Sequence, residues 1–243
     1  MFLELQDDNA FKRIFFDLLK YQLTRGSLQL EGMSAAADTV EKSMNVYNQL
    51  SAINYMFNND VDYSHLGFTN LICEVANLVS GGEVSNFRKT RAEVNGSNVE
   101  RSKATMIRLH LWHLIDDYSY MIKNAKSDKE RFEVEAMFHI RFLHIHPFED
   151  ANGRTARILL TYNLSKNNLA PCIITMDRKR EYCDYIENND IKGLAKLFEE
   201  LSKEELKTML AIYTDLDKKG LIIGNLMTDD QKVRLIKKER YNK

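Results

Sequence analysis

The sequence predicts a mainly α-helical fold with one small β element. Only two prolines, Pro147 and Pro171, occur among the 243 residues, so few positions interrupt long helices. Apolar residues recur at helical spacing along most of the chain. One stretch, residues 81–98, departs from that spacing and is the expected site of the β element.

The helical spacing predicts the helices in order along the chain. Phe11, Phe15 and Leu19 open the first helix, each four residues after the last. The fifth helix is apolar on nearly every side, which is typical of a helix in the middle of a fold. The predicted helices span residues 8–24, 34–57, 66–80, 103–123, 129–145, 153–167, 178–188, 190–201 and 203–217.

Residues 81–98 carry turn signals at both ends. Gly81-Gly82 opens the stretch, and Asn95-Gly96 is a dipeptide that favours tight turns. Apolar and polar residues partly alternate between these two turns. This pattern predicts a short β-hairpin or an extended flap.

The composition is that of a soluble globular protein. Hydrophobic residues make up 44% and charged residues 28%, and the formal net charge is −1. No apolar run reaches the roughly 18 residues that span a bilayer, and the N-terminus lacks the pattern of a signal peptide. Three widely spaced cysteines form neither a disulfide framework nor a metal knuckle. We therefore expect a cytoplasmic protein that binds neither membrane nor nucleic acid.

Residues 146–157, HPFEDANGRTAR, carry the strongest chemical signal. The helix over 129–145 should end at His146, because the residue before a proline is driven out of the α region. Asn152 can cap the next helix, and Gly153 lets the backbone approach a ligand. Unpaired N–H groups at the start of this helix form a natural phosphate site.

Charged residues around that helix start extend the phosphate site. Arg154 and Arg157 lie three residues apart and share a helix face, so they can hold two further phosphates. Asp150 is placed to bind Mg²⁺ between phosphate groups. Each of these residues alone has an ordinary structural reading. Their clustering within twelve residues indicates an enzyme that handles a nucleoside triphosphate.

The same twelve residues resemble the signature of the Fic (filamentation induced by cAMP) family, HPFxxGNGRxxR with an acid at the fifth position. One position departs, because Ala151 stands where the first glycine is usual. The resemblance covers roughly residues 65–200 and implies a Fic-type helical bundle. It divides the chain into an N-terminal helical region with an inhibitory motif (1–64), a Fic core (65–201) and a C-terminal helical extension (202–243).

The resemblance implies a protein adenylyltransferase, which transfers AMP from ATP to a Ser, Thr or Tyr hydroxyl. His146 would be the general base and Asp150 would bind Mg²⁺. The α-phosphate would lie on Asn152 and the backbone N–H groups of Ala151, Asn152 and Gly153. Arg154 would hold the β-phosphate and Arg157 the γ-phosphate.

Two further elements are implied by the resemblance. Residues 86–95 match the flap that aligns the target segment by strand-like pairing, although an ordinary exposed hairpin is the alternative. The adenine contacts are candidates only, because a core or surface helix position is the favoured explanation for each tyrosine. The flap candidates are Phe87, Arg88, Lys89, Thr90 and Arg91, and the adenine candidates are Tyr182, Tyr185 and Asn189.

A second motif resembles the family's inhibitory motif. Residues 27–32 read SLQLEG, with Ser27 and Glu31 four residues apart on one helix face. In proteins with this motif before the core, the glutamate pairs with the second arginine of the signature, which is Arg157 in this chain. Ser27 would anchor the helix. The resemblance therefore implies an auto-inhibited enzyme.

Other functions remain open at this stage. The same fold can transfer phosphate, UMP or phosphocholine, or chiefly remove AMP. A metal-dependent hydrolase built on His144, His146 and Asp150 is a third reading, although no motif such as HExxH supports it. A non-catalytic regulator is the fourth. The expected partners are ATP, a protein substrate that includes the chain itself as a candidate, and a second copy in a homodimer.

Overall fold

The computed structural model describes residues 9–34, 39–59, 61, 63–94 and 96–219. These residues form a mainly helical fold, as predicted, and none of them lies in a β-strand. The α-helices are α2 (Asn9–Leu30), α3 (Val40–Asn58), α4 (His65–Val79), α5 (Ile107–Asn124), α6 (Asp128–Ile145), α7 (Asn152–Lys166), α8 (Lys179–Glu187) and α9 (Ile191–Lys218). Two short 3-10 turns, η1 (Ala104–Met106) and η2 (Met176–Arg178), lead into α5 and α8.

Capping residues set the start of several helices. The hydroxyl of Ser127 accepts a hydrogen bond from the Glu130 N–H at the start of α6, and Ser64 does the same for Gly67 at the start of α4. At its other end, α6 stops at His146, which takes a left-handed conformation with φ 50°. The prediction that the proline ends this helix at His146 is confirmed.

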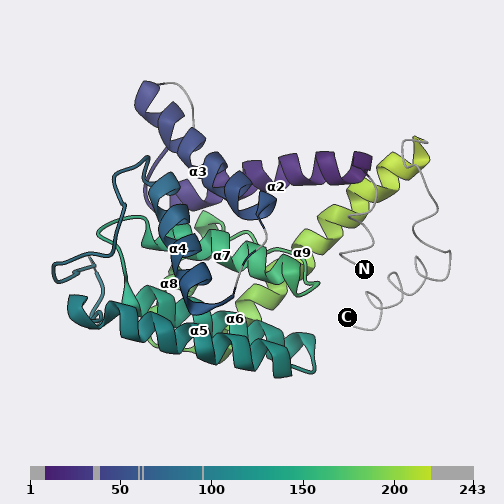
Figure 1. Ribbon diagram of the computed structural model, residues 1–243. Coiled ribbons are helices and arrows are strands. Elements are labelled where there is room, and N and C mark those ends of the chain that lie inside the picture. The colour runs from purple at the N-terminus through teal and green to yellow at the C-terminus, as the bar shows by residue number, and fades with distance from the viewer. Residues whose placement is uncertain (1–8, 35–38, 60, 62, 95, 220–243) are drawn as a thin grey trace.

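Helices α6 and α7 form the centre of the fold (Figure 1). Phe138 and Phe142 of α6 pack into the core shared with α4 and α5. Ala136 and Ile140, on the other side of α6, pack against α8 and α9. Helix α7 is buried along almost its whole length and contacts α2, α3, α4 and α6. The residues that join α6 to α7 are therefore held by the core at both ends.

Helix α2 crosses the bundle and reaches α9 (Figure 1). Phe11 and Phe15 of α2 share a small core with Met209 and Tyr213 of α9. The rings of Phe11 and Tyr213 meet edge to face with centroids 6.0 Å apart. This packing holds the N-terminal half of α2 against α9. The residues at the other end of α2 lie beside the start of α7.

The predicted break between residues 201 and 203 is wrong, because α9 is one continuous helix. Leu201 and Ser202 are both buried, and the Ser202 hydroxyl bonds to the Ala170 carbonyl at 2.6 Å. The proposed boundary between core and extension therefore falls inside a helix, while the division into three regions remains a prediction. The part of the C-terminal extension beyond residue 219 lies outside the described residues.

The predicted β-hairpin is also wrong for the described part of residues 81–98. Gly81 and Gly82 turn with positive φ angles of 71° and 94°, as the sequence predicted. The described residues that follow, 83–94 and 96–98, lie in neither a helix nor a strand. This segment is held instead by Arg88, whose backbone N–H bonds to the Pro147 carbonyl at 2.9 Å. The partial alternation therefore did not produce a hairpin, and the extended flap stays a prediction.

Candidate active site

His146 lies where α6 meets the loop to α7, and its ring is mostly buried. Its Nδ1 lies 3.3 Å from the Leu143 carbonyl. A carbonyl oxygen only accepts, so Nδ1 carries the proton in the neutral ring and Nε2 carries the lone pair. The ring is therefore set up to accept a proton at Nε2.

The surroundings keep His146 neutral. Burial, together with the charges of the nearby Arg101 and Arg88 guanidinium groups, lowers its pKa to about 4, against the opposing effects of the Leu143 carbonyl and Glu31. At neutral pH the ring is thus available as a base in almost every molecule.

Arg88 holds the backbone around His146 in place. Its buried guanidinium donates to the carbonyls of His146 and Thr90, both at 2.6 Å, and to those of Ile145 at 3.2 Å and Ser102. One side chain therefore ties the end of α6 to Thr90 in the flap and to Ser102 beyond it. The sequence suggested that Arg88 faces a target, whereas the structure makes it a scaffold.

The other flap residues surround this anchor. The centroids of the Phe87 and Phe148 rings lie 5.7 Å apart. The Arg108 guanidinium lies 5.2 Å from the centroid of the Phe87 ring. The Thr90 hydroxyl bonds to Glu149 at 2.9 Å. Lys89 and Arg91 are exposed. Thr90 is exposed as well, and the Nε of Arg91 lies 4.0 Å from Glu93.

The loop into α7 is organised by Asn152. Its side chain accepts from the Phe148 N–H at 3.0 Å and donates to the Phe148 carbonyl at 2.9 Å. Asn152 is the first helical residue, so the prediction that it caps α7 is wrong; its side chain is committed to the loop. The N-cap is Ala151, with φ 70°, a conformation that suits glycine and costs alanine about 1–2 kcal/mol. The usual glycine at this position is explained by that angle.

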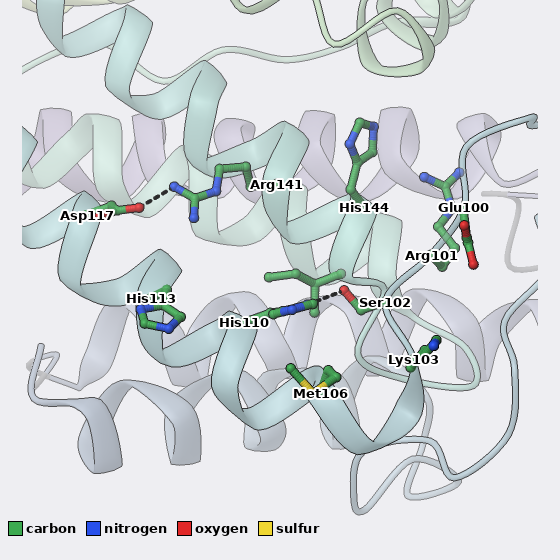
Figure 2. A pocket seen from close by; sticks show the side chains of 11 residues that line it. Glu100, Arg101, Ser102, Lys103, Met106, His110, His113, Asp117, Arg141 and His144 are labelled. Atoms are coloured by element: carbon green, nitrogen blue, oxygen red, sulfur yellow. Dashed lines mark hydrogen bonds and ion pairs between the residues drawn. The ribbon is translucent and has the colours of Figure 1, made fainter.

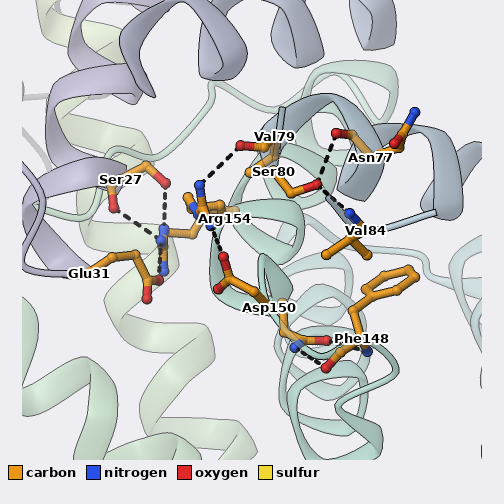
Figure 3. Close-up of polar contacts among 11 residues, drawn as sticks. Ser27, Glu31, Asn77, Val79, Ser80, Val84, Phe148, Asp150 and Arg154 are labelled. Atoms are coloured by element: carbon orange, nitrogen blue, oxygen red, sulfur yellow. Dashed lines mark hydrogen bonds and ion pairs between the residues drawn. The ribbon is translucent and has the colours of Figure 1, made fainter. Parts of the chain in front are cut away.

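Arg154 and Asp150 form a pair beside the helix start (Figure 3). The Arg154 guanidinium bonds to Asp150 Oδ2 at 2.5 Å and to the Val79 carbonyl at 3.0 Å. The arginine side chain is buried, whereas that of Asp150 is 61% exposed. The exposed carboxylate can bind a cation together with phosphate oxygens, which is the usual way that proteins hold Mg²⁺.

Arg157 is occupied by helix α2 (Figure 3 shows Ser27 and Glu31). Its Nε donates to the Ser27 hydroxyl at 2.9 Å and its Nη2 to Glu31 Oε1 at 2.6 Å. A Cβ built on Gly153 would collide with that same Glu31 oxygen. The Glu31 carboxylate thus lies over the N-terminal end of α7, where the sequence placed a phosphate site. The structure brings Ser27, Glu31 and Arg157 together, as the resemblance implied.

The three adenine candidates lie in different environments. Tyr182 is buried, and its hydroxyl lies 2.6 Å from Nε2 of the buried His139. Tyr185 is half-buried and donates to Glu181 at 2.9 Å, and Asn189 is exposed with φ 52°. The buried position of Tyr182 is not that of a residue on an open nucleotide face. Sequence reasoning missed His139, although a histidine in an otherwise apolar helix was a visible signal.

A cavity of about 690 Å³ lies next to the end of α6 (Figure 2). His144 and Ile145 line it together with residues 100–103 and side chains of α5, but none of residues 146–157 does. His144 Nε2 lies 2.9 Å from the Ile186 carbonyl. Among the residues that the structure describes, no three His, Cys, Asp or Glu side chains gather to hold a metal. The described residues therefore offer no set of metal ligands for a metal-dependent hydrolase.

No described helix is long and apolar enough to cross a bilayer.

Comparison with known proteins places this site in a family. Residues 69–164 match the Fic/DOC family. The chain is 28% identical over 144 residues to "Protein adenylyltransferase Fic" of Culex quinquefasciatus, covering 57% of this chain and 27% of the relative. It is 32% identical over 84 residues to the protein of the same name from Aedes aegypti, covering 33% and 17%. The chain thus spans about a quarter or less of the length of these relatives.

Solved structures share the fold. A Fic domain containing signaling protein from Bacteroides thetaiotaomicron superposes with a TM-score of 0.75 at 16% identity, over 88% of this chain and 94% of the other. Fic-1 from C. elegans superposes with a TM-score of 0.65 at 17% identity, over 90% and 71%. The sequence match and the shared fold agree: residues 69–164 match the Fic/DOC family, and the segment 146–157 lies within that match.

Proposed function

We propose that this chain is a protein adenylyltransferase that transfers AMP from ATP to a protein hydroxyl and that Glu31 restrains it. The observation that carries the proposal is the position of a neutral His146 beside a helix start flanked by Arg154 and Arg157. The names of the relatives from Culex quinquefasciatus and Aedes aegypti support the same reaction.

His146 would accept the proton of the target hydroxyl at Nε2. Its Nδ1 is bonded to the Leu143 carbonyl, so the ring keeps its orientation while Nε2 acts. The hydroxyl oxygen would attack the α-phosphorus of ATP, forming the P–O bond to the protein as the bond to pyrophosphate breaks. The proton from the hydroxyl would remain on His146 until it passes to solvent.

The N-terminal end of α7 would hold the triphosphate. Backbone N–H groups at a helix start attract anions, and the positive φ of Ala151 turns the loop into that helix. Arg154 and Arg157 would neutralise the charge of the outer phosphates. Both guanidinium groups are buried and held by hydrogen bonds before any ligand arrives, so once Glu31 has left they would need little reorganisation.

Asp150 is the residue that would hold Mg²⁺. Its exposed carboxylate bonds to Arg154 through Oδ2, which leaves Oδ1 for a cation. The ion would screen the charge of the phosphate oxygens and of the departing pyrophosphate.

Glu31 would act as the brake. Its carboxylate is bonded to Arg157 and lies against Gly153. It would therefore compete with a phosphate group for the Arg157 guanidinium and for the space beside Gly153. Ser27 adds two hydrogen bonds to Arg157, through its hydroxyl and its carbonyl. Nucleotide binding with a properly placed γ-phosphate would require this carboxylate to leave.

The flap would present the target. Residues 89–94 lie in neither a helix nor a strand, and the anchor at Arg88 keeps them beside His146. Backbone pairing along an extended segment can position a hydroxyl without a fixed target sequence. The target could be another protein or this chain itself; a homodimer and a cytoplasmic location remain part of the proposal.

Removal of AMP is the second candidate reaction. The Glu31 carboxylate lies against Gly153, in the same 146–157 segment as His146, so it stands near the proposed phosphate site. A carboxylate there could orient a water molecule towards an AMP-modified side chain. The two reactions make opposite demands on Glu31, since one needs it removed and the other needs it present.

The test is label transfer from ATP labelled at the α-phosphate, with Mg²⁺ and a protein lysate. Wild type, Glu31→Gly and Glu31→Gly with His146→Ala are compared. Adenylyl transfer is expected to rise in Glu31→Gly and to vanish in the double variant. Absence of label in Glu31→Gly, or label that persists without His146, contradicts the proposal. Release of AMP from labelled protein by wild type but not by Glu31→Gly would favour the second candidate.

A further inference from the structure

Helix α2 contains a buried glycine, Gly26, at a position where the local backbone does not require one. Gly32, just beyond the helix end, has a positive φ of 75°, and that angle explains its glycine. Gly26 lies inside the helix and its φ is not positive. A glycine in a helix interior destabilises the helix relative to alanine. A contact outside α2 must therefore account for Gly26.

That contact is with the segment between α7 and α8. A Cβ built on Gly26 would lie 2.9 Å from the carbonyl oxygen of Ile174, whereas ordinary van der Waals contacts of a Cβ are 3.4–4 Å long. The colliding atom belongs to the backbone, so it cannot rotate away as the end of a flexible side chain can. The absence of a side chain at Gly26 thus lets α2 lie directly against the Ile174 carbonyl.

The segment that carries Ile174 is held by the core on its other side. Cys172 and Ile174 are buried in the core that α6, α8 and α9 share. The Ala170 carbonyl accepts a hydrogen bond of 2.6 Å from the Ser202 hydroxyl of α9. A close-packed interior does not take up an added methyl group without movement. We therefore expect a collision at Gly26 to displace the end of α2 rather than this segment.

The contacts of the proposed brake begin at the next residue. The Ser27 hydroxyl accepts from Arg157 Nε at 2.9 Å, and the Ser27 carbonyl accepts from Arg157 Nη2 at 3.1 Å. Glu31 accepts from the same Nη2 at 2.6 Å. Restoring an ordinary contact at Gly26 requires the distance to grow from 2.9 Å to at least 3.4 Å. A displacement of that size along the bond would stretch the contact of the Ser27 carbonyl to about 3.6 Å, which is no longer a hydrogen bond.

We infer that Gly26 is a positioning residue for the proposed brake, because its missing side chain lets α2 approach the Ile174 carbonyl closely enough for Ser27 and Glu31 to reach Arg157. This inference rests on the proposed function and adds to its regulation. The strength of the brake then depends on a residue outside both the SLQLEG segment and residues 146–157. A side chain at position 26 would loosen the brake while every polar group of the two motifs is retained.

The experiment measures the affinity of the full chain for ATP, with Mg²⁺, by calorimetry. Gly26→Ala is expected to raise this affinity about fivefold or more, up to the value of Glu31→Gly, because the nucleotide competes with a weakened pair. In the Glu31→Gly background the same substitution is expected to change the affinity less than about twofold, since the brake is already absent. A loss of stability alone would not produce a gain in affinity that depends on Glu31.

Gly193→Ala is the matched control. Gly193 also lies inside a helix, α9, and a Cβ built on it would collide with the side chains of Tyr185 and Asp190. The added methyl group is thus equally crowded, but the atoms that it meets belong to α8 and the turn after it. Gly193→Ala is expected to leave the affinity for ATP unchanged. Melting temperatures show whether both variants are folded.

The outcomes separate the inference from the proposed function. If Glu31→Gly itself gains no affinity for ATP, the proposed brake is overturned and the inference with it. If Glu31→Gly gains affinity and a folded Gly26→Ala does not, the inference alone is overturned. An equal gain in Gly193→Ala, or a further gain from Gly26→Ala in the Glu31→Gly background, also overturns it, because the effect would not pass through the brake. Loss of the fold in Gly26→Ala overturns it too, since the collision would then not be relieved by movement of α2.

Discussion

Replacing Glu31 with glutamine tests the central contact of the site. The substitution keeps the shape of the side chain and removes its charge, while Ser27 keeps its two hydrogen bonds to Arg157. In the wild-type protein Glu31 Oε1 lies 2.6 Å from Arg157 Nη2. The change therefore isolates the charge of one carboxylate over the start of α7.

The burial of the pair determines the expected magnitude. The side chain of Arg157 is 5% exposed and that of Glu31 is 35% exposed. Removal of one partner costs about 3–5 kcal/mol for a fully buried pair and about 0–1 kcal/mol for an exposed one. A half-exposed carboxylate lies between these limits, so we expect Glu31→Gln to lower the free energy of unfolding by about 1–3 kcal/mol. Since ATP must break the same pair, its apparent affinity should rise about 5- to 150-fold.

The assay combines urea unfolding with nucleotide titration. Glu31→Gln is expected to unfold at lower urea than wild type, and saturating ATP is expected to restore about 2.7 kcal/mol at 100 times the dissociation constant. Glu187→Gln is the matched control, because Glu187 is 30% exposed and pairs with a buried Arg101 at 3.4 Å. It should lose stability without gaining affinity for ATP. Lower stability of Glu31→Gln with unchanged ATP affinity would refute the reasoning, since the pair would then be purely structural.

Three further predictions follow from the geometry. Asn152→Ala leaves the N–H and carbonyl of Phe148 unpaired in the core, so urea unfolding should show a loss of about 2–4 kcal/mol; a loss below about 1 kcal/mol would contradict this account. The pKa of His146 is lowered to about 4, so transfer by Glu31→Gly should stay level from pH 8 to pH 6 and fall only as the pH approaches 4, and an acid limb near pH 6.5 in initial rates would argue against it. Burial raises the pKa of Glu135 to about 8, above its ordinary value of 4.5, so its contribution to stability is complete below pH 4.5 and is lost as the pH rises to 8. Unfolding free energy measured from pH 5 to pH 8 should therefore decline less in Glu135→Gln than in wild type, and identical slopes would exclude this role.

Local patterns in the sequence predicted the elements that carry the site. The apolar periodicity identified α6 and α7, and the proline at 147 indicated where α6 ends. The motif over 146–157 indicated a resemblance to the Fic family, and residues 69–164 match the Fic/DOC family. These features depend on contacts within a few residues along the chain, which spacing reveals directly.

Predictions failed where distant residues compete for the same groups. The alternation after Gly82 suggested a hairpin. The segment is organised instead by the Arg88 guanidinium, which bonds to the carbonyls of His146 and Thr90. Asparagine is a residue type that often caps helices, yet the side chain of Asn152 bonds to the Phe148 backbone instead. The continuity of α9 through Ser202 depends on burial against the Ala170 carbonyl, which spacing does not show.

The sequence by itself determined the helical fold, the family and the residues able to form a phosphate site. Only the tertiary structure decided which of those residues are already occupied. Ser27 and Arg157 lie 130 positions apart, and Arg154 is bonded to a carbonyl 75 positions away. Such contacts depend on how helices pack against one another, because long-range packing and burial, rather than local spacing, select the partner of a buried charge.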